Sequence, residues 1–343
     1  MKKSHLFIGL LIAVGALYYC MHNISIPELI KSFSKIHWFY LIPMFMMIIV
    51  QFILRAYRWS YLINPLKVVT TKELMPSLYI GFMCNLLPAR LGEAIRAFVL
   101  SKKIQLPFTA CIGTIFIERL FDILLLGISL IICLFFYPEA FIPKSVGGNE
   151  NIVTSIKAFG VMSAVLFVAL MVFSYTLAHW HDQTVVVVKK FIFFLKESWQ
   201  EKILLLIGHF SDGLGVLKSA KETLIVFLLS AILWGCFIVT YLPAYYMYDL
   251  QDLPIQSLFI LTTMVCIFIT IIPTPAFIGS FQMGVVFTLS DGFGVDHVTS
   301  NSFGLIVWFF TTMFTVLGGI YYLFKENLSL TQLVKEEQEA EGQ

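Results

Sequence analysis

Residues 253–290 contain no charged side chain in 38 consecutive positions. A helix of about 20 apolar residues already crosses the hydrocarbon core of a bilayer, so a stretch of this kind favours a membrane-embedded fold. Similar apolar runs recur along the chain, which is 59% hydrophobic and 13% charged. None of them shows the alternation of polar and apolar residues over about ten positions that membrane barrels show. The sequence therefore predicts an all-α, polytopic membrane protein.

The apolar runs predict about six full spans and two interrupted segments. The full spans are expected at 5–21, 38–58, 108–137, 152–178, 222–248 and 299–324. The interrupted segments are 73–103 and 253–290. Proline and glycine interrupt helices, so each of these segments is expected to form two short helices rather than one crossing. The residues at the breaks are Pro88 and Gly92 in the first segment, and Pro273, Pro275 and Gly279 in the second.

Lysine and arginine residues gather at one set of span ends, which predicts the orientation of the chain. Because basic residues favour the cytoplasmic side, both termini are expected there, in the cytoplasmic (inner) membrane. Residues 73–103 then begin and end inside, and residues 253–290 begin and end outside, as two re-entrant hairpins that enter from opposite faces. PARLG at 88–92 and PAFIG at 275–279 also look alike. The hairpins could therefore be inverted-topology repeats that gate a site between them.

We expect one integral membrane domain, 1–328, followed by a disordered polar tail, 329–343. Within the domain, 184–220 alternates apolar positions every three or four residues with lysines on the other faces. This pattern is typical of amphipathic helices that lie on the cytoplasmic leaflet.

Three groups of charged residues lie where lipid or protein interior is expected. The first is at the inner end of the second span, the second follows the first helix break, and the third is in the middle of the 108–137 span. A charged side chain at the bilayer centre costs at least about 2.5–3.5 kcal/mol, so such groups must pair or face a wet cavity. In chain order they are Arg55, Arg58, Arg90, Glu93, Arg96, Glu118, Arg119 and Asp122.

Two interpretations of these charges remain open from the sequence. In the first, they form a buried ion-pair network in which Arg90 or Arg96 pairs with Glu118 or Asp122. In the second, they line a polar cavity that accepts a charged headgroup. Both can hold together, since ion pairs can position arginines for a phosphate.

The helix breaks add polar groups to the candidate site. The break at Pro88 and Gly92 exposes backbone N–H groups at the start of a half-helix, and such an end attracts anions. Asn85 could donate a further hydrogen bond there. The second break offers Ser280 and Gln282 but no charge.

Several classes of function are disfavoured by the sequence. A net charge of +2 gives no reason to expect a nucleic-acid partner. The six cysteines form no CxxC pair, and no metal-ligand or nucleotide-binding motif is present. We therefore expect no enzymatic activity, no cofactor and no metal site.

NLLPARLGEAIR (85–96) followed by IERLFD (117–122) resembles the transmembrane domain of the lysylphosphatidylglycerol synthase family. The family pattern is met here by Asn85, Pro88, Arg90, Gly92, Glu93, Arg96, Glu118, Arg119 and Asp122. RAYRW at 55–59 resembles the basic and aromatic end of that family's second span. The resemblance runs from about 5 to 325, and it implies a membrane domain that moves lipid between leaflets.

The sequence departs from that family in two ways. PTPAFIGSFQ places Gln282 near the position where the family has an acidic residue, which weakens any role that needs a carboxylate to hold a cationic headgroup. The full synthases also carry a soluble aminoacyl-transfer domain. This chain ends shortly after its last span, so synthesis of a lysyl-lipid is not expected of it.

The sequence thus predicts translocation of a phosphate-bearing lipid, either a phospholipid or a polyprenyl-phosphate-linked glycan. Arg90, Arg96, Arg119 and Asn85 would bind the phosphate, while the carboxylates of Glu93, Glu118 and Asp122 would hold the arginines and could exchange protons. The alternatives are an ion- or proton-coupled small-solute transporter and a non-transporting accessory subunit of a membrane glycosyl-transfer pathway. The expected partners are membrane lipids, and a homo-oligomer or a lipid-modifying enzyme partner is compatible with the sequence.

Overall fold

The computed structural model describes residues 25–86, 91–137, 197–272 and 274–329, with isolated positions at 15, 18, 162, 165, 168, 169, 172, 175, 176, 189 and 190. Every regular element in these residues is helical, and the prediction of an all-α protein is confirmed. Most of the expected spans 5–21 and 152–178, most of residues 184–196 of the expected interfacial helices and nearly all of the tail lie outside the described residues.

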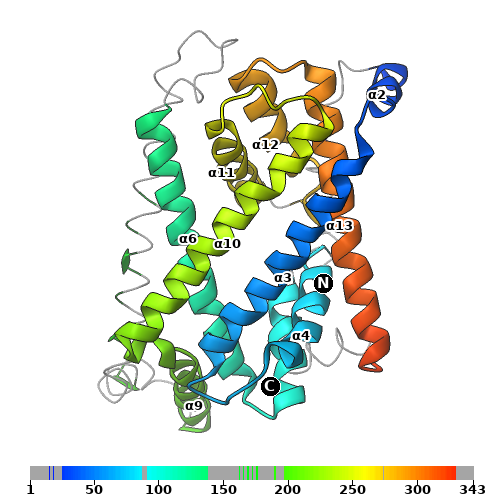
Figure 1. The fold of residues 1–343 in the computed structure, drawn as a ribbon. Helices are drawn as coiled ribbons and strands as arrows, with labels where there is room; N and C mark the ends of the chain where they lie inside the picture. The colour runs from blue at the N-terminus through cyan, green and yellow to red at the C-terminus, as the bar shows by residue number, and fades with distance from the viewer. Residues whose placement is uncertain are drawn as a thin grey trace.

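Four of the described helices are long and apolar enough to cross a membrane. They are α3 (Leu41–Ile63) with the short turn η1 (Trp38–Tyr40) before it, α6 (Phe108–Phe136), α10 (Ala220–Met247) and α13 (His297–Lys325). Each matches an expected span, and they run between the two ends of the bundle, with α3 and α10 side by side (Figure 1). One boundary was wrong, because α3 continues to Ile63 rather than ending at 58.

The helix α3 is apolar on two faces. One face, with Met44, Ile48 and Phe52, is buried among other helices. The opposite face exposes large apolar side chains such as Met46 and Ile53. A soluble protein would place charged residues on the exposed face, so this pattern is that of a helix with protein on one side and lipid on the other.

The two interrupted segments each form a pair of short helices that pack against each other. The first pair is α4 (Thr71–Cys84) with α5 (Gly92–Ile104). The second is α11 (Gln256–Ile271), the turn η5 (Pro275–Phe277) and α12 (Ser280–Val286), which continues as the π-helix η6 (Phe287–Gly292). The longest of these helices has 16 residues, or about 24 Å at 1.5 Å per residue, which is less than the roughly 30 Å of a bilayer core. The two pairs occupy opposite ends of the bundle (Figure 1).

The breaks of the two pairs meet inside the bundle. The backbone N–H of Ala276 donates a hydrogen bond to the carbonyl of Leu86 over 3.0 Å. The indole N–H of Trp308 on α13 donates to the carbonyl of Ala276 over 2.8 Å. Ala276, Phe277 and Gly279 have φ values of 51°, 60° and 85°, a left-handed conformation that is costly for the two residues with a side chain. Backbone strain of this kind is often found at functional sites.

A missing Cβ at Gly81 allows α4 and α5 to approach closely. A Cβ added to Gly81 would lie 2.5 Å from the Cβ of Arg96 and 2.8 Å from the carbonyl oxygen of Gly92. The helix α11 approaches α12 in a similar way, since a Cβ on Gly284 would lie 2.7 Å from the Cα of Val265. Both helix pairs therefore depend on a glycine where they cross.

Replacing Gly81 with valine is expected to destabilise the protein by at least about 1–3 kcal/mol, because the new side chain overpacks the crossing of α4 and α5. Thermal unfolding in detergent would measure this loss. The matched control is Gly127→Ala on α6, where an added Cβ meets nothing within 4 Å and where alanine favours the helix by about 0.5–1 kcal/mol. Equal unfolding midpoints for Gly81→Val and the wild type would contradict the crossing.

Two smaller elements complete the described fold. The helix α9 (Glu197–Gly213), followed by the turn η4 (Gly215–Lys218), packs against the first turns of α6. The short helix α2 (Ile26–Phe33) was not expected from the sequence. It begins at a capping box in which Ser25 and Glu28 each accept a hydrogen bond from the other's backbone N–H.

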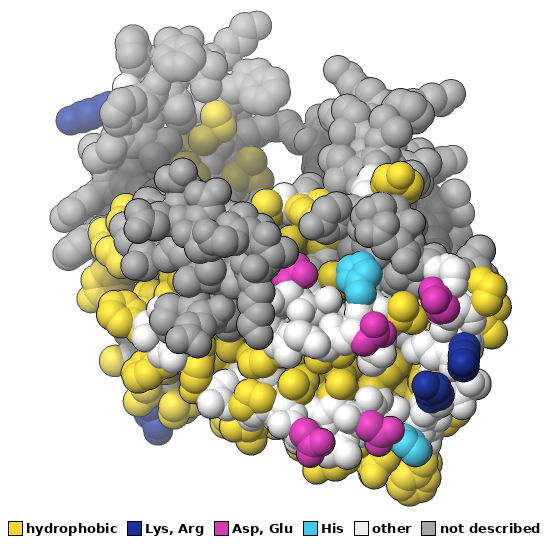
Figure 2. Space-filling model, turned by 90° about the horizontal axis from the view of Figure 1, so that it is seen from above, with side chains coloured by type: hydrophobic (Ala, Val, Ile, Leu, Met, Phe, Trp, Pro, Cys, Tyr) yellow, Lys and Arg dark blue, Asp and Glu magenta, His cyan; other side chains and the backbone are white. Residues whose placement is uncertain are grey.

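The two ends of the bundle differ in charge. Figure 2 shows the end that carries α2 and the loops beside α11 and α12, where acidic and histidine side chains outnumber basic ones. Its described acidic residues are Glu28, Asp249, Asp252, Asp291 and Asp296, and its described lysines are Lys31 and Lys35. The other end carries Lys67, Lys72, Lys102, Lys103, Lys218, Lys221 and Lys325 together with the acidic residues Glu73, Glu201, Asp212, Glu222 and Glu326, so lysines outnumber acidic residues there.

Candidate functional site

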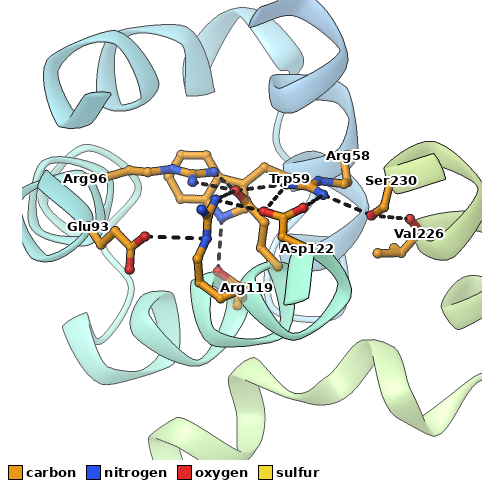
Figure 3. A network of polar contacts seen from close by, with 10 residues as sticks. Arg58, Trp59, Glu93, Arg96, Arg119, Asp122, Val226 and Ser230 are labelled. Carbon is orange, nitrogen blue, oxygen red and sulfur yellow. Dashed lines mark hydrogen bonds and ion pairs between the residues drawn. The ribbon is translucent and has the colours of Figure 1, made fainter. Parts of the chain in front are cut away.

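The carboxylate of Glu118 lies at the centre of a charge network formed by three helices (Figure 3). Arg96 of α5 binds it with two parallel hydrogen bonds of 2.9 and 2.8 Å. Arg58 of α3 lies 3.1 Å away, and Arg119 lies 2.6 Å away. Neither Glu118 nor Arg58 exposes any of its side chain. A carboxylate held by three guanidinium groups can stay ionised without water.

Asp122, one turn further along α6, extends the network to α10. Arg58 donates to Asp122 over 2.6 Å and to the hydroxyl of Ser230 over 2.9 Å. Ser230 in turn donates to the carbonyl of Val226. Arg119 also contacts Asp122 over 3.2 Å. Arg58 therefore joins α3, α6 and α10 through a single side chain.

The aromatic ring of Trp59 holds Arg96 in place. The guanidinium of Arg96 lies over the ring of Trp59, 3.7 Å from its centroid, an arrangement that stabilises a cation electrostatically. The indole N–H of Trp59 donates to the hydroxyl of Thr114 over 3.1 Å. The ring is therefore fixed by α6, which also carries Glu118.

The described network is balanced in formal charge. It contains three arginines and three carboxylates, the third carboxylate being that of Glu93, 3.4 Å from Nε of Arg119. The first interpretation of the buried charges, a network of ion pairs, is therefore what the structure shows for Arg96 and Glu118. Among the arginines of the network, Arg119 is the most exposed, with about a third (33%) of its side chain accessible.

Arg55 and Arg58, which the sequence placed at the inner end of the second span, direct their side chains into the helix bundle. Arg58 has no exposed side-chain surface, and Arg55 lies between the aromatic rings of Phe82 and Phe237, 4.4 and 4.9 Å from their centroids. The reason is that α3 extends beyond the expected end of the span, which places both residues within the helix bundle.

Two of the three polar residues at the breaks, Gln282 and Ser280, form hydrogen bonds within the second break. The carboxamide oxygen of Gln282 accepts a hydrogen bond from the N–H of Gly279 over 2.7 Å, and the hydroxyl of Ser280 lies 2.9 Å from that of Thr274. Asn85 ends α4, and its side-chain oxygen is buried without a hydrogen-bond partner. Gly92 begins α5, and Pro275 begins η5. Pro88, Arg90 and Pro273 lie outside the described residues.

A cavity of about 270 Å³ lies beside Arg55. The sequence did not reveal it, because its wall is assembled from six helices, of which α4 belongs to the first short pair and α11 and α12 belong to the second. Its lining residues that carry polar groups are Gln51, Arg55, Thr240, Tyr241, Thr262, Cys266, Thr311 and Thr315. One sequence pattern could have indicated a polar site here: Gln51, Arg55 and Arg58 are spaced so that they share a face of an otherwise apolar helix. No comparable pattern in the sequence indicates that Ser230 contacts the charge network.

Comparison with known sequences places this arrangement in a family. Residues 6–319 match the family described as the lysylphosphatidylglycerol synthase TM region. The chain belongs to that family. The match covers every element of the charge network and both pairs of short helices, so the lysylphosphatidylglycerol synthase TM region is the unit in which this site is built.

The chain is similar in sequence to the UPF0104 membrane protein MJ1078 of Methanocaldococcus jannaschii. It is 28% identical over 253 residues, which cover 72% of this chain and 96% of the relative. No solved structure matches the chain. Membership of the lysylphosphatidylglycerol synthase TM region family is compatible with a membrane role related to lipids.

Proposed function

We propose that this protein moves a phosphate-bearing lipid between the two leaflets of the cytoplasmic membrane. The observation that carries the proposal is the cavity beside Arg55, whose largely apolar wall also carries polar groups and includes Phe82 of the first helix pair and Phe281 of the second. Polar groups at membrane depth are costly unless they line a cavity or a pathway. A cavity bordered by both helix pairs is a suitable place for a headgroup to pass.

In this proposal the two helix pairs are re-entrant hairpins that control access to the cavity from opposite leaflets. Both pairs are too short to cross a bilayer core, and their breaks touch where Ala276 donates to Leu86. Separation of this contact would open the cavity toward one side. The acyl chains would stay in the lipid beside the exposed apolar faces of the long helices.

The orientation follows from the charge of the two ends. The end with Lys67, Lys102 and Lys218 would face the cytoplasm, because basic residues concentrate on that side. The acidic end in Figure 2 would then face outward. This orientation places the α4–α5 hairpin on the cytoplasmic side and the α11–α12 hairpin on the outer side.

The substrate class in this proposal is a phospholipid or a polyprenyl-phosphate-linked glycan, and no chemical conversion of the lipid is proposed. Within the charge network, Arg119 is the arginine best placed to contact a phosphate, since Arg96 is enclosed by Glu118 and Trp59. Gln282 stands at the second break where a carboxylate would suit a cationic headgroup, so an anionic headgroup fits better.

Reconstitution tests the function directly. Vesicles that contain the purified protein and a fluorescently labelled phosphatidylglycerol are treated with dithionite, which quenches only the outer leaflet. We expect inner-leaflet fluorescence to be lost faster than in protein-free vesicles and in vesicles with heat-unfolded protein. Equal rates in all three would contradict translocation of this lipid, and the same assay with a labelled polyprenyl phosphate would test the second substrate class.

A further inference from the structure

Arg55 has a different environment from the arginines of the charge network. Arg58, three residues later on the same helix, contacts two carboxylates. Arg55 makes two cation–π contacts but no hydrogen bond and no ion pair among the described residues. Burying a charge without a partner is costly. Each carboxylate of the charge network already pairs with an arginine of that network, so none is left to pair with Arg55. Arg55 therefore leaves one positive charge uncompensated in the described interior.

The cavity beside Arg55 offers hydrogen-bonding groups but no negative charge. No aspartate or glutamate is among its described lining residues. Gln51 lies one turn before Arg55 and donates to the hydroxyl of Thr240 over 2.5 Å. Tyr241 also lines the cavity, and its hydroxyl makes no hydrogen bond with any described residue. One cation and several neutral polar groups are what a singly charged oxyanion needs.

The size and the walls of the cavity suit a headgroup rather than a bare ion. A cavity needs only about 10–15 Å³ to hold one water molecule, and this one has a volume of about 270 Å³. The remaining walls are aliphatic and aromatic, including Ile48, Phe52 and Val265. Apolar walls around one charged group favour an amphiphile over a free inorganic anion.

We propose that Arg55, together with Gln51 and Tyr241, binds the phosphate of a lipid whose headgroup carries a net negative charge. This inference rests on the proposed function for its choice of a lipid as the source of the phosphate. The site discriminates against cationic headgroups, because a second positive charge would lie near Arg55 with no carboxylate in the lining to offset it. Arg119 and the rest of the network hold α3 in place but are not the main phosphate ligands.

Native mass spectrometry of the detergent-purified full chain tests the site without requiring transport. The probes are phosphatidylglycerol, a cationic ethylphosphocholine lipid whose phosphate is fully esterified, and inorganic phosphate. We expect phosphatidylglycerol to bind at least about 10-fold more tightly than the ethylphosphocholine lipid, a difference of about 1.4 kcal/mol. Inorganic phosphate at millimolar concentration should not displace it.

The variants are Arg55→Leu, Arg55→Lys and the control Lys35→Leu, which removes one exposed cation from the end of the bundle. Arg55→Leu should weaken phosphatidylglycerol binding about 10-fold or more. Arg55→Lys should retain part of the affinity, because lysine keeps the charge but loses the planar fork. Lys35→Leu should bind as the wild type does. Unchanged unfolding midpoints establish that each variant is folded.

The outcomes separate the site from the function. Equal affinity of Arg55→Leu and the wild type for phosphatidylglycerol would overturn this inference even if the wild type moves lipid. Displacement by inorganic phosphate would overturn the assignment to a lipid. Loss of binding in Arg55→Leu, with no transport by the wild type, would support the site and count against translocation.

Discussion

Replacing Glu118 with alanine is expected to cost about 3–5 kcal/mol of folding free energy, the usual effect of removing one partner from a buried ion pair. The carboxylate of Glu118 lies within 3.1 Å of three guanidinium groups, those of Arg58, Arg96 and Arg119. Without it, Arg58, Arg96 and Arg119 would face one another around a cavity with only Asp122 and Glu93 to balance them. A loss of this size is a large part of the stability of an ordinary domain, so little folded protein should remain in detergent.

The matched control for this prediction is Glu93→Gln. Glu93 belongs to the same network, but 43% of its side chain is exposed and its single contact with Arg119 is 3.4 Å long. Exposed ion pairs contribute about 0.2–1 kcal/mol, so this variant should unfold close to the wild type. Thermal unfolding of both variants in the same detergent measures the difference. Similar midpoints for the two would show that Glu118 does not organise the network.

Part of this architecture could be predicted, because a charged side chain in an apolar segment is stable only if it pairs with another charge or faces water. The cost of leaving a charge unpaired in lipid favoured pairing of Arg90 or Arg96 with Glu118 or Asp122 as one of two interpretations, and the structure pairs Arg96 with Glu118. Proline and glycine in 73–103 and 253–290 predicted a pair of short helices in each segment, and both pairs are present. These inferences depend on local rules that the rest of the fold cannot easily override.

The positions of Arg55 and Arg58 could not be predicted in the same way. An arginine near the end of a span usually extends its side chain to the interface, so the sequence indicated an inner-face position for both. Only the packing of α3 against α6 and α10 shows that Arg58 reaches Asp122 and Ser230. The cavity beside Arg55 depends on six helices at once, and no local pattern contains that information.

The helix α2 was missed for a different reason. The residues SIPE at 25–28 are a recognisable capping box, with proline in the first turn, and the structure uses it as such. Long apolar runs predict spanning helices, and an eight-residue helix is too short to appear among them. In this case the signal was present in the sequence.

Joining the two hairpin breaks with a disulfide is expected to abolish lipid translocation. The donor Ala276 N–H and the acceptor Leu86 carbonyl lie 3.0 Å apart, which brings their backbones close to the Cα separation of about 4.4–6.8 Å that disulfides require. Phe82 and Phe281, a few residues from these positions, line the cavity. If the breaks must separate for a headgroup to pass, a covalent link between them holds the cavity closed toward at least one leaflet.

The experiment uses Leu86→Cys with Ala276→Cys in a background in which the six native cysteines are replaced. Oxidised protein should move labelled phosphatidylglycerol no faster than protein-free vesicles, and a reductant should restore the rate. Each single cysteine variant, treated with the same oxidant, should retain full translocation. Mass spectrometry establishes whether the link forms. Failure of the link to form would contradict the contact between the breaks, whereas full transport by linked protein would show that the breaks do not need to separate.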